Sequence, residues 1–383
     1  MTLRVSHVIA EFSAREAMGR TVVETAARVP GVHSVIAAYV HDSAEIFADS
    51  VALGGAMETF PLGRSEALAE ALAAQRPDLV HVHGGALVPL LVAGSAVRQY
   101  PNVVTIYAWP RMPAPQALRS AGLRAAVDSN VLRPRVVATT VLPAAVAARA
   151  LRRADVAAVL SPDPRVLTKL RGRLGVPLLR MGSGAPESSL RAVAPDQVDS
   201  PVVVFVGRAE TVRGVDTLIE AFPAVRRAVP GARLRLLLLP RPELDAIVAM
   251  ARRVGGPEVV EISTEPIPDV LAEMAAAQVG AWPFKFDYTT SPPAMAVAEA
   301  MSVGLPVVST SVACVDAVLG PGAPALTVAP QDPRGLAEAL VSLLTDADRW
   351  SALADAAPGF VTERLGWDQM ALTTQEAYRA AGR

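Results

Sequence analysis

Two arginines lie on either side of a glycine-containing turn in the second half of the chain. A strand-like apolar run ends at Gly207 and Arg208, and Arg213 immediately precedes the next helical pattern. Planar guanidinium groups bind phosphate oxygens through paired hydrogen bonds, and the free amides at a helix start favour anions. The pattern therefore indicates a diphosphate site. The alternative is that both arginines form ion pairs with Glu210 and Asp216.

A single carboxylate, Glu299, lies between Ala298 and Ala300 in an otherwise apolar helical segment. Ser291 is a good N-cap and Pro292 suits the first helical position, so the helix is expected to start there. Burying a carboxylate without a partner costs free energy. Glu299 is therefore expected to bind a sugar diol or, as the alternative, a neighbouring arginine.

The first half of the chain contains histidines and carboxylates that could transfer protons. His81 and His83 are two residues apart, so they share one face of a strand, and His83 is nearer its carboxyl end. Glu11 and Glu16 come at the end of the first strand-like run and are candidates for a base on the acceptor side. For these two, a solvated loop position stays equally open. His7 is expected to be a satisfied strand residue.

Alternation of β-branched runs with helical patterns predicts two successive α/β domains with parallel sheets. The first domain is expected over 1–185, a polar linker over 186–200, and the second domain over 201–360. A final helix is expected within 361–383. Ligands bind at the carboxyl ends of parallel strands, so the cleft between the domains is the expected site.

Composition excludes several classes of protein. The 383 residues include 36 Lys and Arg against 37 Asp and Glu, a balance that gives no field to hold nucleic acid. Cys314 is the single cysteine, which excludes an internal disulfide and a cysteine-based metal site. The chain start lacks the apolar core of a signal peptide, and no apolar run reaches roughly 18 residues. A cytoplasmic location is therefore expected.

Three motifs carry a resemblance to a known family: GR at 207–208, RGVDTLIEAF at 213–222, and EAM at 299–301 followed by GLPVV at 304–308. They resemble the donor domain of group 1 glycosyltransferases, the retaining family 4 type with the GT-B fold. The resemblance implies two Rossmann-like, doubly wound domains whose parallel sheets face each other across a cleft. It also implies a last helix that crosses back to the first domain.

The same resemblance implies roles for individual residues. Arg208 and Arg213 would hold the donor diphosphate, Glu299 would bind the ribose, and Gly19 would lie beside the phosphate or the sugar. The expected donor-binding set is Gly19, Gly207, Arg208, Arg213, Ser291, Pro292, Pro293 and Glu299. The expected catalytic set is Arg208, Arg213 and His83, and the acceptor-side candidates are Glu11, Glu16 and Tyr107. No carboxylate beside the arginines is expected to hold a magnesium ion together with the phosphates, so neither a metal nor another cofactor is expected.

At three positions the chain departs from the family pattern. Ser291 stands eight residues before Glu299, where relatives carry a glutamate associated with the donor sugar. Tyr107 replaces a histidine that many relatives carry after the corresponding strand. Arg213 replaces the usual lysine, which keeps the charge and adds a second fork.

The expected function is transfer of a sugar from a nucleotide-diphosphate sugar, in particular a UDP-sugar, with retention at the anomeric carbon. The acceptor could be a small molecule, a carrier-bound intermediate or a lipid, which leaves peripheral membrane contact open. Inversion stays an alternative and would need a base such as Glu11, Glu16 or His83. A nucleotide-sugar epimerase of the same fold and a non-catalytic subunit are the two rival functions. The Arg- and Ala-rich composition suggests a bacterial gene, so natural-product or cell-envelope biosynthesis is the expected setting.

Overall fold

The computed structural model describes residues 2–12, 17–41, 47, 49–53, 65–111, 134–287 and 293–382. Contacts divide the chain into two compact units, of which the first holds the described residues up to 111, those from 134 to 184 and those from 367 onward. The second unit holds the described residues of the range 185–366. Residues 186–200, predicted as a linker, belong to the second unit, where the Ala192 amide donates to the Val303 carbonyl at 2.8 Å.

The first unit is built on a seven-stranded parallel sheet in the order β3-β2-β1-β4-β5-β6-β7. Its strands are β1 (Leu3–Phe12), β2 (Val32–His41), β3 (Val51–Ala52), β4 (Leu79–Gly84), β5 (Asn102–Ile106), β6 (Val156–Ser161) and β7 (Leu178–Arg180). The winding direction reverses between β1 and β4. In a doubly wound sheet this reversal is the point at which ligands bind.

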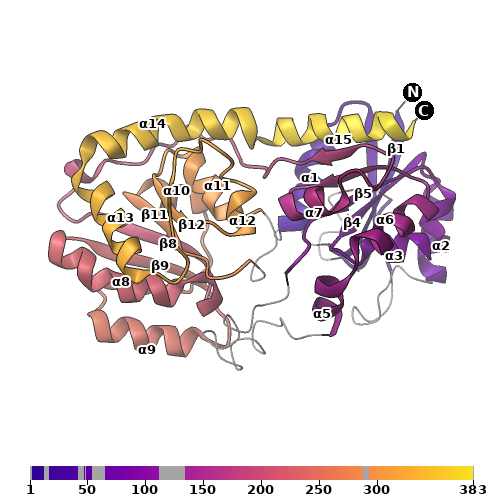
Figure 1. The fold of residues 1–383 in the computed structure, drawn as a ribbon. Coiled ribbons are helices and arrows are strands. Elements are labelled where there is room, and N and C mark those ends of the chain that lie inside the picture. The colour runs from indigo at the N-terminus through magenta and orange to yellow at the C-terminus, as the bar shows by residue number, and fades with distance from the viewer. Residues whose placement is uncertain are drawn as a thin grey trace. The chain divides into compact units, whose positions relative to one another are not determined.

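Helices cover both faces of this sheet (Figure 1). They are α1 (Ala17–Arg28), α2 (Glu66–Gln75), α3 (Val88–Ala93), α6 (Ala144–Arg153), α7 (Pro164–Leu170) and α15 (Trp367–Ala381). A further helix, α5 (Pro134–Val141), precedes α6 in the chain. Val8, Val82 and Val104 point to the face that α2, α3 and α6 cover, where they form the apolar core. The opposite face lies under α1 and α15, which contact each other. The largely apolar segment 136–151 favours a buried or surface helix. The structure has two helices there, α5 and α6, separated at Pro143 because proline cannot donate a helical hydrogen bond.

The last helix, α15, belongs to the first unit, as the sequence predicted. It contacts α1, β5 and β6. The chain leaves this unit at Gly184 and returns at Trp367, and the two residues touch. Gly184 has a φ of 65°, and a Cβ added there would lie 2.1 Å from the Trp367 ring. Glycine is therefore required where the chain passes the start of α15.

The second unit has a six-stranded parallel sheet in the order β10-β9-β8-β11-β12-β13. Its strands are β8 (Val202–Arg208), β9 (Arg233–Leu239), β10 (Val260–Ser263), β11 (Val279–Trp282), β12 (Val307–Thr310) and β13 (Leu326–Val328). Its helices are α8 (Val215–Ala228), α9 (Leu244–Val254), α10 (Val270–Ala275), α11 (Met295–Ser302), α12 (Ala313–Asp316), α13 (Pro333–Thr345) and α14 (Ala347–Arg364). In Figure 1, α8 lies beside α9 and α13. The winding reverses between β8 and β11, so the prediction of two doubly wound α/β domains is confirmed.

Candidate functional site

The turn after β8 brings the two predicted arginines to the reversal point of the second sheet. Gly207 and Arg208 are the last two residues of β8, and Arg213 ends the short 3-10 helix Thr211–Arg213. Gly214 follows with a φ of 83°, and a Cβ there would lie 1.9 Å from the Pro283 carbonyl oxygen. Glycine is needed because the segment after β11 packs directly against this turn.

Arg213 is held by an ion pair. Its Nε donates to the Glu210 carboxylate at 2.9 Å, and Arg241 lies 3.9 Å from the other Glu210 oxygen. The Arg213 side chain is 17% exposed, so the contact is partly shielded from water. The ion-pair alternative therefore holds for Arg213 with Glu210. Glu210 also gives the guanidinium one fixed orientation at the start of α8.

A third cation, which was not predicted from the sequence, lies at the same turn. Lys285, three residues after β11, forms an ion pair with Asp216 in the first turn of α8. Both side chains are about 15% exposed, at 14% and 15%. Lys285 could have been identified from the sequence as a candidate site residue, because it is one of two lysines in the chain and follows a strand end. Asp216 thus pairs with a lysine rather than with either predicted arginine partner.

Helix α11 begins later than predicted. It starts at Met295, and the Ala294 amide donates to the Cys314 carbonyl at 2.8 Å. The predicted start at Pro292 is wrong, because a residue that precedes a proline disfavours helical dihedrals and Pro293 follows. Ser291 and Pro292 lie outside the described residues, whereas Pro293 is described and half-buried.

Glu299 lies in the second turn of α11 and is half-buried between the fully buried Ala298 and Ala300. Its own carbonyl accepts from the Ser302 hydroxyl at 2.7 Å. The helix follows β11, and the arginine turn follows β8. Since β8 and β11 are neighbours in the sheet, Arg208, Arg213 and Glu299 all come from segments that leave the reversal point.

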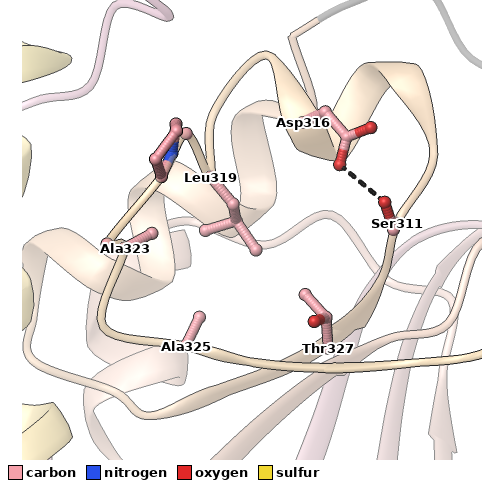
Figure 2. A pocket seen from close by; sticks show the side chains of 9 residues that line it. Ser311, Asp316, Leu319, Ala323, Ala325 and Thr327 are labelled. Atoms are coloured by element: carbon pink, nitrogen blue, oxygen red, sulfur yellow. Dashed lines mark hydrogen bonds between the residues drawn. The ribbon is translucent and has the colours of Figure 1, made fainter.

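A cavity of about 450 Å³ lies elsewhere in the second unit (Figure 2). It is lined by Ser311, Asp316, Leu319, Gly320, Pro321, Gly322, Ala323, Ala325 and Thr327, and includes none of the predicted site residues. The Ser311 hydroxyl donates to Asp316 at 3.1 Å. Burial and the nearby charge of Asp287 raise the pKa of Asp316. Asp287 itself accepts from the Ala313 amide at 2.8 Å and fixes the start of α12.

In the first unit, His83 and Tyr107 are joined and buried. The His83 Nδ1 atom lies 3.2 Å from the Tyr107 hydroxyl, and the two residues are 3% and 7% exposed. Burial lowers the pKa of His83 well below its usual value and raises that of Tyr107. Gly19 lies in the first turn of α1 and is buried. Glu11 is on β1, and Glu16 lies outside the described residues.

His83 belongs to a cluster of three buried histidines with His7 and His81. One ring nitrogen from each lies within 4.8 Å of the others, a spacing that could hold a metal ion. However, all six ring nitrogens already have hydrogen-bond partners within the described residues. His81, for example, contacts Tyr378 of α15 at 2.9 Å and Thr105 at 2.8 Å. The hydrogen bond between His7 and His83 was not predicted from the sequence, although both strands were predicted.

Residues 200–346 match the model of the family described as Glycosyl transferases group 1. The match runs from before β8 to the end of α13 and contains Arg208, Arg213 and Glu299. The second unit is therefore similar, over these residues, to a group 1 glycosyltransferase domain. Over 205 residues the chain is 28% identical to a D-inositol 3-phosphate glycosyltransferase of Corynebacterium urealyticum, covering 51% of this chain and 46% of that protein. The chain therefore matches about half the length of that relative.

Several solved structures resemble the chain over almost its whole length. A sucrose-phosphate synthase from Thermosynechococcus elongatus superposes with a TM-score of 0.70 at 19% identity, covering 98% of both chains. The HepE protein of Anabaena in complex with UDP gives a TM-score of 0.72 at 14% identity, covering 99% of this chain and 100% of that one. These likenesses show the GT-B fold, as predicted. Among the described residues, no helix has the length and apolar character needed to cross a membrane.

Proposed function

We propose that the chain transfers a sugar from a UDP-sugar to an acceptor hydroxyl or amine, with retention and without a metal. The arginine turn at the reversal point of the group 1 domain carries this proposal. Arg208 and Arg213 stand where a helix start and two guanidinium groups can meet a diphosphate. HepE of Anabaena, which shares the fold, was crystallised with UDP and with UDP-glucose. That supports uridine as the first nucleotide to test.

Leaving-group stabilisation would come from fixed positive charge. Negative charge develops on the departing diphosphate, and a preorganised donor is most effective where charge develops. Glu210 holds Arg213 in one orientation before any ligand binds. Lys285 adds a third cation at the same turn. These groups supply the role that a divalent cation has in other transferases, so activity should survive EDTA.

Glu299 would bind the ribose. A half-buried carboxylate on an apolar helix gains from two hydroxyl donors, and a diol supplies two. Glu299 and the arginine turn come from the two segments that leave the reversal point. The ribose and the diphosphate of one nucleotide would then be held by groups from neighbouring segments.

For His83, burial argues against a role as the base on the acceptor side. His83 is 3% exposed and its ring nitrogens contact His7 and Tyr107, so it is poorly placed to take a proton from an acceptor. Retention, in which the leaving phosphate takes the acceptor proton, needs no such base. The matched relative named for D-inositol 3-phosphate suggests a phosphorylated polyol as the first acceptor to test.

The test is calorimetric binding of UDP and UDP-glucose, followed by sugar transfer with and without EDTA. Arg213→Ala should weaken binding, whereas Arg227→Ala, an exposed arginine in the last turn of α8, should not. Wild-type protein that binds neither ligand would refute the UDP assignment. Loss of transfer in EDTA, restored by magnesium or manganese, would refute metal independence. Hydrolysis or epimerisation of donor without any acceptor product would point to the rival functions.

A further inference from the structure

Part of one face of the first sheet is polar, beside an apolar cluster of Ile9, Ile36 and Val22 on the same face. Beneath α1 and α15, strands β1, β4 and β5 contribute His7, His81, His83 and Thr105, all of them buried. The opposite face is the apolar core. A buried polar layer is costly unless every group is paired, and here the ring nitrogens are paired without exception.

Five side chains of this layer form a continuous chain of hydrogen bonds. Ser34 Oγ lies 3.1 Å from His7 Nε2, and His7 Nδ1 lies 3.0 Å from His83 Nε2. His83 Nδ1 then contacts the Tyr107 hydroxyl, which is hydrogen-bonded to the Thr21 side chain. This chain of hydrogen bonds runs from β2 through β1 and β4 to the segment after β5 and to α1. It ends two residues from Gly19, a predicted site residue.

This chain of hydrogen bonds couples the tautomers of His7 and His83. A neutral imidazole carries one donor and one acceptor. If His83 Nδ1 donates to Tyr107, then Nε2 must accept, so His7 Nδ1 carries the proton. If His83 Nε2 donates instead, His7 Nδ1 must accept, so His7 carries its proton on Nε2. In both cases His7 and His83 have the same tautomer. Burial keeps both rings neutral, since it lowers the pKa of His7 to about 3 and that of His83 well below its usual value.

We propose that His7 is a positioning residue that fixes the tautomer of His83 and, through Tyr107 and Thr21, the start of α1 that carries Gly19. Its effect on the reaction rests on the proposed function, together with the expected place of Gly19 beside the donor phosphate or sugar. Its effect on the His83 tautomer rests on the geometry alone. The two effects can therefore be tested apart.

A bound metal ion would require a different proton arrangement. Both facing nitrogens, His7 Nδ1 and His83 Nε2, would then be unprotonated, so the two rings would have opposite tautomers. A dication would also lie among three neutral, buried ligands without a carboxylate. Each ring nitrogen already has a partner, so the hydrogen-bond chain is the better account of the cluster.

The first experiment records ¹⁵N imidazole resonances of the wild-type protein at neutral pH, with metal content measured on the same sample. Assignment uses His7→Asn and His83→Asn. Equal tautomers for His7 and His83 in metal-free protein are expected. Opposite tautomers, or about one equivalent of zinc that survives dialysis, would overturn the proposal and make the cluster a metal site.

The second experiment uses a matched pair of variants. Asn places its amide near the His Nδ1 position, and Gln places its amide near Nε2. His7→Asn therefore keeps the contact with His83 and loses Ser34, whereas His7→Gln keeps Ser34 and loses His83. Each variant loses one hydrogen bond, so their melting temperatures should be similar. Ser34→Ala loses the same bond as His7→Asn and is the control.

The expected result is a difference in turnover between variants of equal stability. With UDP-sugar as donor, His7→Gln should lower kcat by about 10-fold or more, the usual scale for loss of an orienting partner. His7→Asn and Ser34→Ala should stay within about threefold of wild type, and the donor KM should change in none of them. Equal kcat for His7→Gln and His7→Asn would overturn the proposal. Wild-type protein without transfer would refute the proposed function instead, while the ¹⁵N spectra still decide the tautomer.

Discussion

The two sheet reversal points in this chain are built from opposite kinds of polar group. Between β1 and β4 the groups are neutral imidazoles and hydroxyls, buried and joined in one network. Between β8 and β11 they are full charges in partly exposed ion pairs, Arg213 with Glu210 and Lys285 with Asp216. Neutral hydrogen-bonded groups fix one another's orientation without adding charge, whereas an ion pair holds a cation where an anionic ligand can bind. The first arrangement suits orientation and the second suits binding of a diphosphate.

Acid should break the neutral network, with the largest effect expected. The pKa of His7 is about 3 in the folded protein and near 6.5 when unfolded, and the pKa values of His81 and His83 are lowered in the same direction. The unfolded chain therefore binds more protons below pH 6.5. Stability should be constant above that pH and fall as pH decreases toward the folded pKa values. Each histidine contributes up to about 1.4 kcal/mol per pH unit, so the three together approach about 4 kcal/mol per unit.

Urea unfolding at pH 7 and pH 5.5 measures this loss. His7→Asn should lower the pH dependence by about one proton, because one titrating group is removed. A free energy of unfolding that stays flat between the two pH values would show that the histidines are not held neutral.

Arg213→Ala should break the charged site. Turnover is expected to fall about 100–1,000-fold, by comparison with removal of one oxyanion donor, and donor binding should weaken less. Arg213→Lys keeps the charge but loses the planar fork, so an intermediate rate is expected. Steady-state kinetics measures turnover and donor KM for both Arg213 variants, with Arg227→Ala as the control. Wild-type turnover in Arg213→Ala, with an unchanged melting temperature, would make the Glu210 pair a surface ion pair with no part in transfer.

Glu299→Gln should weaken the nucleotide end of the same site. Binding of UDP and of the whole UDP-sugar is expected to weaken by similar amounts, on the order of 1.5–3 kcal/mol for a hydrogen bond to a charged group. Calorimetry with both ligands measures this. If the affinity for UDP does not change, Glu299 does not contact the ribose.

Gly214→Ala should displace the arginine turn without removing a charge, so it tests how tightly this turn packs against the segment after β11. The new Cβ would meet the Pro283 carbonyl, whereas Gly322, with a similar φ of 76°, has open space around its Cβ position. Both substitutions carry the strain of positive φ, about 1–3 kcal/mol, so Gly214→Ala should cost about 1–2 kcal/mol more. Urea unfolding of the two variants gives the difference. Equal losses would mean that the segment after β11 moves away freely.

Local patterns were sufficient for the elements. Apolar periodicity predicts strands over 156–161 and 279–282 and a helix over 333–345, and the structure has these elements with the same bounds. For the helix, Asp332 caps the first turn and Pro333 takes the first position, so the residues that set its start are adjacent in sequence. The start of α11 was missed because Ala294 is held by Cys314, twenty residues further along the chain.

The sequence by itself determined the two α/β domains, the arginine turn after β8 and the carboxylate on α11, because each depends on residue types within a short window. Only the tertiary structure decided which charges pair and which histidines touch. Glu210 forms an ion pair with Arg213, but Asp216 forms one with Lys285, which follows another strand. His7 meets His83 because β1 and β4, 76 residues apart between these two side chains, are neighbours in the sheet. Such partners are set by strand order and register, which no local pattern contains.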